Sequence, residues 1–225
     1  MTKRALVTGT SSGIGHAIAR DLLADGWHVT GLARRGPSFD SAAYSHVPVD
    51  LANADATQAA IAELPVPDAL IHAAGLLRVG ALADMDRADG ARMWRLHVDC
   101  SAQLLQHFGP RMANGGRVVL LGSRVSTGAK EKALYAASKA ALDGLARSVA
   151  AELAPQGVTV NIVAPAATDT PMLADPARAS FSPALPPMGR LIDPTEVSGT
   201  VLFLLSPAAA SMTGQRLVIC AGASL

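Results

Sequence analysis

Tyr135 and Lys139 are the residues whose types and spacing point most directly to chemistry. Residues four apart share one face of an α-helix, with their Cβ atoms roughly 5–6 Å apart. An ammonium group beside a phenol stabilises the phenolate and lowers the phenol pKa from its ordinary value near ~10. Tyr135 is therefore a candidate general acid or base. The alternative is an amphipathic helix in which this spacing serves packing alone.

Length, composition and charge narrow the classes of function. The chain has 225 residues, half of them apolar, and a formal net charge of +1. This length supports one sizeable core, so we expect a single domain over residues 1–225. No run of like charges suggests nucleic acid or a membrane surface, which leaves a small molecule as the expected partner. The sequence shows no signal-peptide pattern and no segment of membrane-spanning length, which predicts a cytoplasmic protein.

The cysteines argue against disulfide bonds and metal binding. Cys100 and Cys220 lie far apart and form no C-x-x-C pair. His97 precedes Cys100 by three residues and His107 lies beyond, but no second cysteine pair completes a zinc site. We expect no metal ion.

Alternation of short aliphatic runs with helical periodicity begins at Ala5 and predicts an α/β fold, with a doubly wound parallel sheet covered by helices on both faces. The expected strands are residues 5–8, 28–33, 45–49, 69–73, 117–121, 158–163 and 217–220. The longest expected helix covers residues 133–153, with Leu142, Leu145 and Val149 at core spacing. Residues 168–187 are rich in proline and lack a clear period. A loop of this length is usually functional, so we expect a substrate-covering loop near residues 168–190.

A glycine-rich turn connects the first expected strand to the first expected helix. Glycines let the backbone turn tightly and approach a pyrophosphate, while the helix N-terminus attracts the anion. The spacing G-x-x-x-G-x-G differs from G-x-G-x-x-G but has the same strand–turn–helix context. We favour nucleotide binding over an ordinary turn. The residues expected to bind are Gly9, Ser11, Ser12, Gly13, Ile14 and Gly15.

The end of the second expected strand bears on the choice of nucleotide. It carries Arg34 and Arg35 and no carboxylate that would accept a hydrogen bond from the ribose 2′-hydroxyl of NAD. Arginine instead suits the 2′-phosphate of NADP through charge-assisted hydrogen bonds. The alternative is a solvated loop arginine. Asp50, after the third strand, is expected to accept a hydrogen bond from the adenine amino group, or else to be a helix N-terminal acid.

Together with these motifs, several further stretches make the chain resemble the short-chain dehydrogenase/reductase family over residues 3–225. They are Asp50-Leu51, Ala73-Ala74-Gly75, Gly122-Ser123, the segment 161–170 and Thr213-Gly214-Gln215. The chain looks most like bacterial 3-oxoacyl-acyl-carrier-protein reductases. The resemblance implies a Rossmann-type sheet of about seven parallel strands in a three-layer αβα arrangement, a nicotinamide cofactor, a Ser–Tyr–Lys active site, and a homotetramer or homodimer.

The resemblance also implies roles for individual residues. Tyr135 would protonate the carbonyl oxygen during reduction, and Lys139 would bind the nicotinamide ribose and lower the tyrosine pKa. Ser123 would stabilise the developing alkoxide, and we prefer it to Ser126 because it directly follows the fifth strand. Further cofactor contacts are implied for Leu51, Ala73, Ala74, Gly75, Tyr135, Lys139, Pro165, Thr168 and Thr170.

The chain departs from the family pattern at several positions, which include Pro165-Ala166 in place of Pro-Gly and Cys220-Ala221-Gly222 in place of Asp-Gly-Gly. Our alignment places His97 on the fourth long helix, where the family has an asparagine that helps hold a water connecting the lysine to solvent. Histidine can also donate, accept and titrate near neutral pH, so we include His97 among the catalytic candidates; the alternative is a packed histidine. His72 with Ala73 replaces two asparagines, which predicts the loss of amides that support the sheet.

The expected function is that of an NADP(H)-dependent oxidoreductase that reduces a ketone or a 3-oxoacyl group, with NAD(H) less favoured. The alternatives are an NAD-dependent dehydrogenase of a cyclic diol or hydroxy acid and a cofactor-binding protein with degenerate chemistry. The covering segment is mainly apolar, which favours an apolar small molecule or acyl thioester over a sugar. Its apolar residues are Met172, Leu173, Phe181, Leu185 and Met188, and its charges are Asp175 and Arg178.

Overall fold

A seven-stranded sheet forms the middle of the molecule. The computed structural model describes residues 2–37, 39–175 and 185–225. Every neighbouring pair of strands is parallel, in the order β3-β2-β1-β4-β5-β6-β7. The strands are β1 (Arg4–Thr8), β2 (His28–Ala33), β3 (Tyr44–Pro48), β4 (Ala69–His72), β5 (Arg117–Leu121), β6 (Thr159–Pro165) and β7 (Arg216–Ile219). This sheet confirms the predicted α/β class, and the predicted strand ends lie within two residues of the observed ends.

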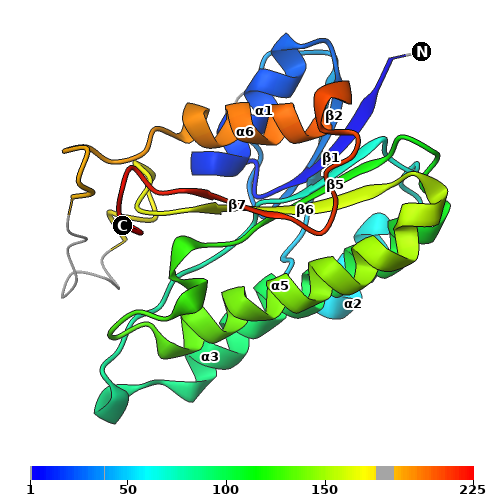
Figure 1. Ribbon diagram of the computed structural model, residues 1–225. Helices are drawn as coiled ribbons and strands as arrows, with labels where there is room; N and C mark the ends of the chain where they lie inside the picture. Colours follow the sequence, from blue (N-terminus) through cyan, green and yellow to red (C-terminus); the bar gives the residue numbers. More distant parts are fainter. Residues whose placement is uncertain (1, 38, 176–184) are drawn as a thin grey trace.

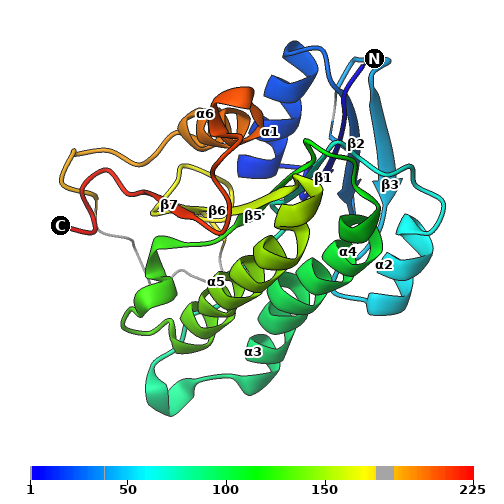
Figure 2. The same cartoon turned by 45° about the vertical axis from the view of Figure 1, so that its right-hand side comes forward.

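Helices cover both faces of the sheet, which completes the predicted three layers. Helices α1 (Gly13–Ala24) and α6 (Pro194–Leu205) lie on one face (Figure 1). The other face carries α2 (Ala54–Ile61), α3 (Arg87–Trp94), α4 (Cys100–Phe108) and α5 (Ala133–Leu153), with α4 beside α5 in the turned view (Figure 2). Among the described residues, no helix is both long enough and apolar enough to cross a membrane.

The sheet order creates a crevice at the carboxyl ends of β1 and β4. From β1 the chain builds outward through β2 and β3, and then returns to place β4 on the other side of β1. Ligands of open α/β sheets bind where the strand order reverses in this way. The Thr8 hydroxyl, at the end of β1, accepts hydrogen bonds from the backbone N–H groups of Ala73 and Ala74 at 3.0 and 2.9 Å. Gly9 has φ +75°, and a Cβ there would lie 2.9 Å from the Ala74 backbone, so only glycine fits this turn.

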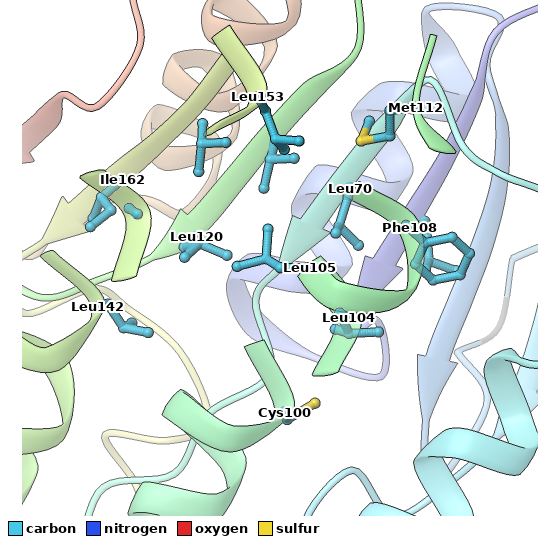
Figure 3. Close-up of a cluster of buried hydrophobic side chains, with 14 of the residues drawn as sticks. Leu70, Cys100, Leu104, Leu105, Phe108, Met112, Leu120, Leu142, Leu153 and Ile162 are labelled. Atoms are coloured by element: carbon cyan, nitrogen blue, oxygen red, sulfur yellow. The ribbon is translucent and has the colours of Figure 1, made fainter. Parts of the chain in front are cut away.

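Apolar side chains fill the space on both sides of the sheet. Figure 3 shows the cluster between the sheet and the α4–α5 face, in which Cys100 lies among Leu104, Leu105 and Phe108. Burial raises the pKa of the Cys100 thiol to about 12, so Cys100 is a packing residue. On α5 the prediction of a core stripe is confirmed for Leu142, while Leu145 and Val149 pack at the margin of the cluster. The fully covered neighbours Ala146 and Ala150 are small, which lets the helix approach the sheet closely.

Candidate functional site

A cavity of about 560 Å³ opens at the carboxyl ends of the central strands. Its lining includes all four predicted catalytic residues, Ser123, Tyr135, Lys139 and His97. These side chains come from the segment after β5, from α5 and from the segment between α3 and α4. The fold therefore brings together residues that the sequence places up to 42 positions apart.

Ser123 faces this cavity because of the turn that follows β5. It caps a short 3-10 helix, Arg124–Thr127, and its Oγ accepts a hydrogen bond from the Val125 N–H at 3.3 Å. The other serine considered, Ser126, accepts a hydrogen bond from Arg216 and does not line the cavity. This geometry supports the choice of Ser123 as the residue that contacts substrate.

Lys139 is buried beside the cavity, one helical turn beyond Tyr135. Its Nζ donates a hydrogen bond to the Leu121 carbonyl at the end of β5 at 2.7 Å. Burial lowers the pKa of Lys139 from 10.5 to about 7. The only other phenol of the sequence belongs to Tyr44, which shares a hydrogen bond of 2.9 Å with the Thr10 hydroxyl. Tyr44 does not line the cavity. Tyr135 is thus the phenol placed to act.

His97 links Tyr135's helix to the segment after β4. The Leu76 N–H donates to Nε2 at 3.2 Å, so the ring proton must lie on Nδ1, which donates to Ser138 Oγ at 2.9 Å. The Ser138 hydroxyl in turn donates to the Tyr135 carbonyl at 2.8 Å. Burial, and then the charges of Lys139 and His72, hold the pKa of His97 well below its ordinary value. The imidazole is therefore neutral near physiological pH.

The placement of His97 differs in detail from the prediction. It lies in a π-helical segment, Arg95–Asp99, rather than in a regular fourth helix, and its side chain is completely buried. A Cβ at Gly75 would lie 3.3 Å from His97 Nε2 and 3.9 Å from Lys139 Nζ, so both nitrogens border the same small space. Both ring nitrogens already have protein partners, which makes His97 a positioning residue in this structure. Its part in a proton relay stays a prediction.

Two contacts near the site were missed by the sequence analysis. Ser138 precedes Lys139 on the buried face of the helix, and its position within the Tyr135–Lys139 motif was the available signal. His72 was expected to cost the sheet its supporting amides; the amides are absent, but the imidazole makes two supporting contacts that the sequence analysis did not predict. Its Nε2–H donates to the Leu96 carbonyl at 2.9 Å, and Nδ1 accepts from the Thr8 hydroxyl at 3.0 Å. The imidazole thus provides the support that amides would give.

Replacement of His97 tests its contribution. We expect His97→Leu to lower kcat roughly tenfold or more, because it leaves the Leu76 N–H without its acceptor, at about 1–3 kcal/mol, and removes the donor that holds Ser138 Oγ beside Tyr135. His97→Asn keeps a donor and an acceptor and should retain substantially more activity. The measurement is kcat for the three proteins, with thermal unfolding as a check on folding. A His97→Leu protein as fast as the parent would show that His97 serves packing alone.

A groove of about 320 Å³ adjoins the cavity and holds most of the predicted cofactor residues. Those lining it are Gly9, Ser11, Ser12, Gly13, Ile14, Gly15, Arg34, Asp50, Leu51, Ala73, Ala74, Gly75 and Thr170. Ile14, Ala73, Gly75 and Thr170 also line the catalytic cavity, together with Pro165 and Thr168. Arg35 lines neither space, so its predicted contact is not supported by this geometry.

The residues present in the groove fit a dinucleotide. Helix α1 begins here, its N-cap residue Ser12 makes no capping hydrogen bond through its side chain, and its first turn holds no acidic residue. Unsatisfied N–H groups and the helix dipole therefore face the groove and suit a pyrophosphate. Arg34 lines the groove directly after β2 and is exposed. Within the described parts of the chain it makes no ion pair. Asp50 accepts the Ala52 N–H at 3.1 Å and precedes the Asn53 cap of α2, so it lies outside that helix.

Part of the predicted covering loop also borders the cavity. Its two ends are joined by a bridge between Thr168 and Ile192. Met172, Leu173 and Leu185 line the cavity, whereas Met188 is exposed and does not. Asp175 forms an ion pair of 3.0 Å with Arg78. Phe181 and Arg178, also named in the prediction, lie outside the described residues.

Comparisons with known proteins agree with this geometry. The sequence profile of a family described as enoyl-(acyl carrier protein) reductase matches residues 9–224. The 2,3-dihydro-2,3-dihydroxybenzoate dehydrogenase of Escherichia coli is 34% identical, over 99% of this chain and 97% of the relative. A 3-oxoacyl-acyl-carrier-protein reductase of Vibrio cholerae is also 34% identical, over 98% and 96%.

Solved structures give the same result. A short chain dehydrogenase of Burkholderia cenocepacia, in complex with NADP, superposes with a TM-score of 0.86 at 33% identity, covering 99% of this chain and 98% of the other. A short chain dehydrogenase family protein of Francisella tularensis gives a TM-score of 0.91 at 26% identity, with 100% and 99% covered.

Proposed function

The chain belongs to the short-chain dehydrogenase/reductase family of oxidoreductases, and from this premise we propose that it reduces a ketone or a 3-oxoacyl group to a secondary alcohol with NADPH. The convergence of Ser123, Tyr135 and Lys139 on one cavity, beside a groove suited to a dinucleotide, is the observation that carries the proposal. When bound, the nicotinamide would supply the hydride for the carbonyl carbon.

The chain's own residues would manage the oxygen and its proton. The Tyr135 hydroxyl donates the proton that converts the alkoxide to an alcohol. The Ser123 hydroxyl donates a hydrogen bond to the same oxygen and stabilises the charge that develops there. Lys139, fixed by the Leu121 carbonyl, contacts the nicotinamide ribose and, in its charged form, favours ionisation of Tyr135.

Arg34 supports the choice of NADP over NAD. It lines the groove at the end of β2 as an exposed cation, where a 2′-phosphate would accept charge-assisted hydrogen bonds. We expect Arg34→Ala to weaken NADPH binding roughly tenfold or more, and to leave NADH binding nearly unchanged. Fluorescence titration with both cofactors measures the ratio. Arg35→Ala is the matched control because Arg35 is the adjacent exposed arginine and does not line the groove. Equal losses for NADPH and NADH would instead place Arg34 on the fold or on a phosphate common to both.

The choice of substrate separates the proposal from its alternative. Much of the lining around the catalytic residues is apolar, which favours a largely apolar ketone or thioester. Similarity to a dehydrogenase of a dihydroxylated cyclic acid keeps an NAD-dependent oxidation of a cyclic diol or hydroxy acid as the second candidate.

One experiment addresses these functions together. The protein is titrated with NADPH and NADH and then assayed with a panel of ketones, a 3-oxoacyl thioester and cyclic diols, in both directions. Ketone reduction that prefers NADPH supports the proposal. Diol oxidation with NAD supports the second candidate, and cofactor binding without turnover supports a degenerate protein.

We further propose that the chain acts as one domain and assembles as a homodimer or homotetramer. Phe203 on α6 and Val218 on the edge strand β7 expose 42% and 39% of their surface, and burial of such apolar side chains favours association. Light scattering in solution measures the mass of the assembly, and a monomeric mass would contradict the oligomer.

A further inference from the structure

Several basic side chains line the cavity beside Tyr135, and one of them has no role in the proposed reaction. Among the described residues, its lining includes Arg124, Lys130, Lys132 and Lys139, and includes no aspartate or glutamate. A cleft lined by charge of one sign concentrates the opposite charge. Lys139 is accounted for by its role beside Tyr135, whereas Arg124 has no part in the proposed reaction.

Arg124 directly follows Ser123 and is half-buried. Its Nη1 donates to the Ala223 carbonyl of the C-terminal segment at 3.1 Å, and its Nε is buried without a hydrogen-bond partner among the described residues. A guanidinium has five N–H donors, so this single contact leaves most of its capacity unused. The donors that reach the cavity are available to a ligand, and a ligand that satisfied the buried Nε would remove the cost of an unpaired polar atom.

Two other arginines of the chain, neither of them in the cavity lining, form ion pairs with carboxylates. Arg78 pairs with Asp175 at 3.0 Å, and Arg216 lies 3.8 Å from Asp143. In the described parts of the chain, no carboxylate lies within ion-pair distance of Arg124. Arg124, the residue next to Ser123, therefore lacks a carboxylate partner in the described part of the chain.

We propose that the substrate carries a carboxylate, which Arg124 binds while Ser123 and Tyr135 hold the ketone oxygen. The planar guanidinium matches a carboxylate through paired, charge-assisted hydrogen bonds. The apolar lining from Val125, Leu173 and Leu185 would cover the carbon chain between the two groups. This inference rests on the proposed function and narrows its substrate class to oxo acids.

The test compares oxo acids with their uncharged esters. The probes are 4-oxopentanoate, 5-oxohexanoate and 6-oxoheptanoate, each paired with its methyl ester, since the acid and the ester differ chiefly in charge. We expect the parent protein to favour one acid over its ester roughly 10- to 100-fold in kcat/KM with NADPH, as one charged hydrogen bond allows. Arg124→Met should abolish this preference and leave reduction of the ester within about threefold of the parent.

The variants separate recognition from folding and from general charge. Arg124→Lys keeps the charge without the paired donors and should give an intermediate preference. Lys130→Met removes a cavity cation whose side chain is 93% exposed, and should leave the preference nearly unchanged. If Arg124→Met lowers acid and ester equally, Arg124 only anchors the segment at Ala223 and the proposal is wrong. The proposal is also wrong if the parent prefers no acid.

Calorimetric titration of the same acids and esters, with NADP present, provides a readout that needs no turnover. Binding of an acid that is lost in Arg124→Met, without any reduction of ketones, would uphold the carboxylate site and overturn the reductase. Reduction of ketones with no selectivity for acids would support the reductase and overturn the carboxylate site. Absence of both acid binding and acid reduction would overturn the carboxylate site.

Discussion

Tyr135→Phe is expected to lower kcat at least about 100-fold while leaving cofactor affinity within roughly twofold, because a positioned general acid contributes about 10²–10⁴ in rate. The substitution removes only the hydroxyl. The ring packs edge-to-face on His97 with 5.7 Å between centroids, and the Tyr135 carbonyl still accepts from Ser138, so the local structure should persist. Steady-state rates and a fluorescence titration with NADPH measure the two quantities.

Tyr44→Phe is the matched control for this experiment. It removes the other phenol of the chain, whose hydroxyl meets only Thr10 among the hydrogen bonds described. We expect full activity and a loss of about 1 kcal/mol in the free energy of unfolding. A Tyr135→Phe protein that keeps more than a few per cent of the parent rate would remove Tyr135 from the role of proton donor.

Lys139→Met is expected to inactivate the protein and at the same time to stabilise its fold. Burial lowers the pKa of Lys139 from 10.5 to about 7, which corresponds to a cost of roughly 5 kcal/mol for keeping the charged group buried. The variant also loses the hydrogen bond to the Leu121 carbonyl, at about 1–3 kcal/mol. We therefore expect a net gain of about 2–4 kcal/mol in the free energy of unfolding at pH 6.5, with weaker cofactor binding because the ribose contact is lost.

The pH dependence distinguishes this explanation from general repacking. Between about pH 7 and 10.5 the unfolded chain holds a proton on Lys139 that the folded protein has lost, so the stability of the parent rises with pH in this window. Lys139→Met has no titrating group at this position. Its gain in free energy of unfolding over the parent should therefore shrink by roughly 2–3 kcal/mol between pH 6.5 and 9. Urea unfolding at both pH values measures the difference.

Lys130→Met controls for the loss of a lysine as such. Its side chain is 93% exposed, so we expect no change in the free energy of unfolding at either pH. An advantage of Lys139→Met that stays constant from pH 6.5 to 9 would mean that Lys139 ionises normally in the folded protein.

The αβα architecture and the candidate site residues follow from patterns that are local in the sequence. Aliphatic runs separated by helical periods can bury their apolar faces in few ways, so the strands and the helix Ala133–Leu153 were found within one or two residues. The glycine turn at residues 9–15 and the pair Tyr135/Lys139 are local patterns, since glycine conformations and the four-residue helical spacing depend on neighbours in the chain.

Contacts between side chains that are distant in the sequence could not be predicted from local patterns, because they depend on how the chain packs. The support that His72 gives the sheet depends on Leu96 and on Thr8, which is 64 residues away in the sequence. The neutral state of His97 depends on its burial and on the nearby charge of Lys139. Likewise, only the packed chain shows that, among the described residues, no carboxylate lies within ion-pair distance of Arg124. Burial and hydrogen-bond partners set the protonation and cost of a polar group, and both are properties of the packed chain that residue type and spacing do not contain.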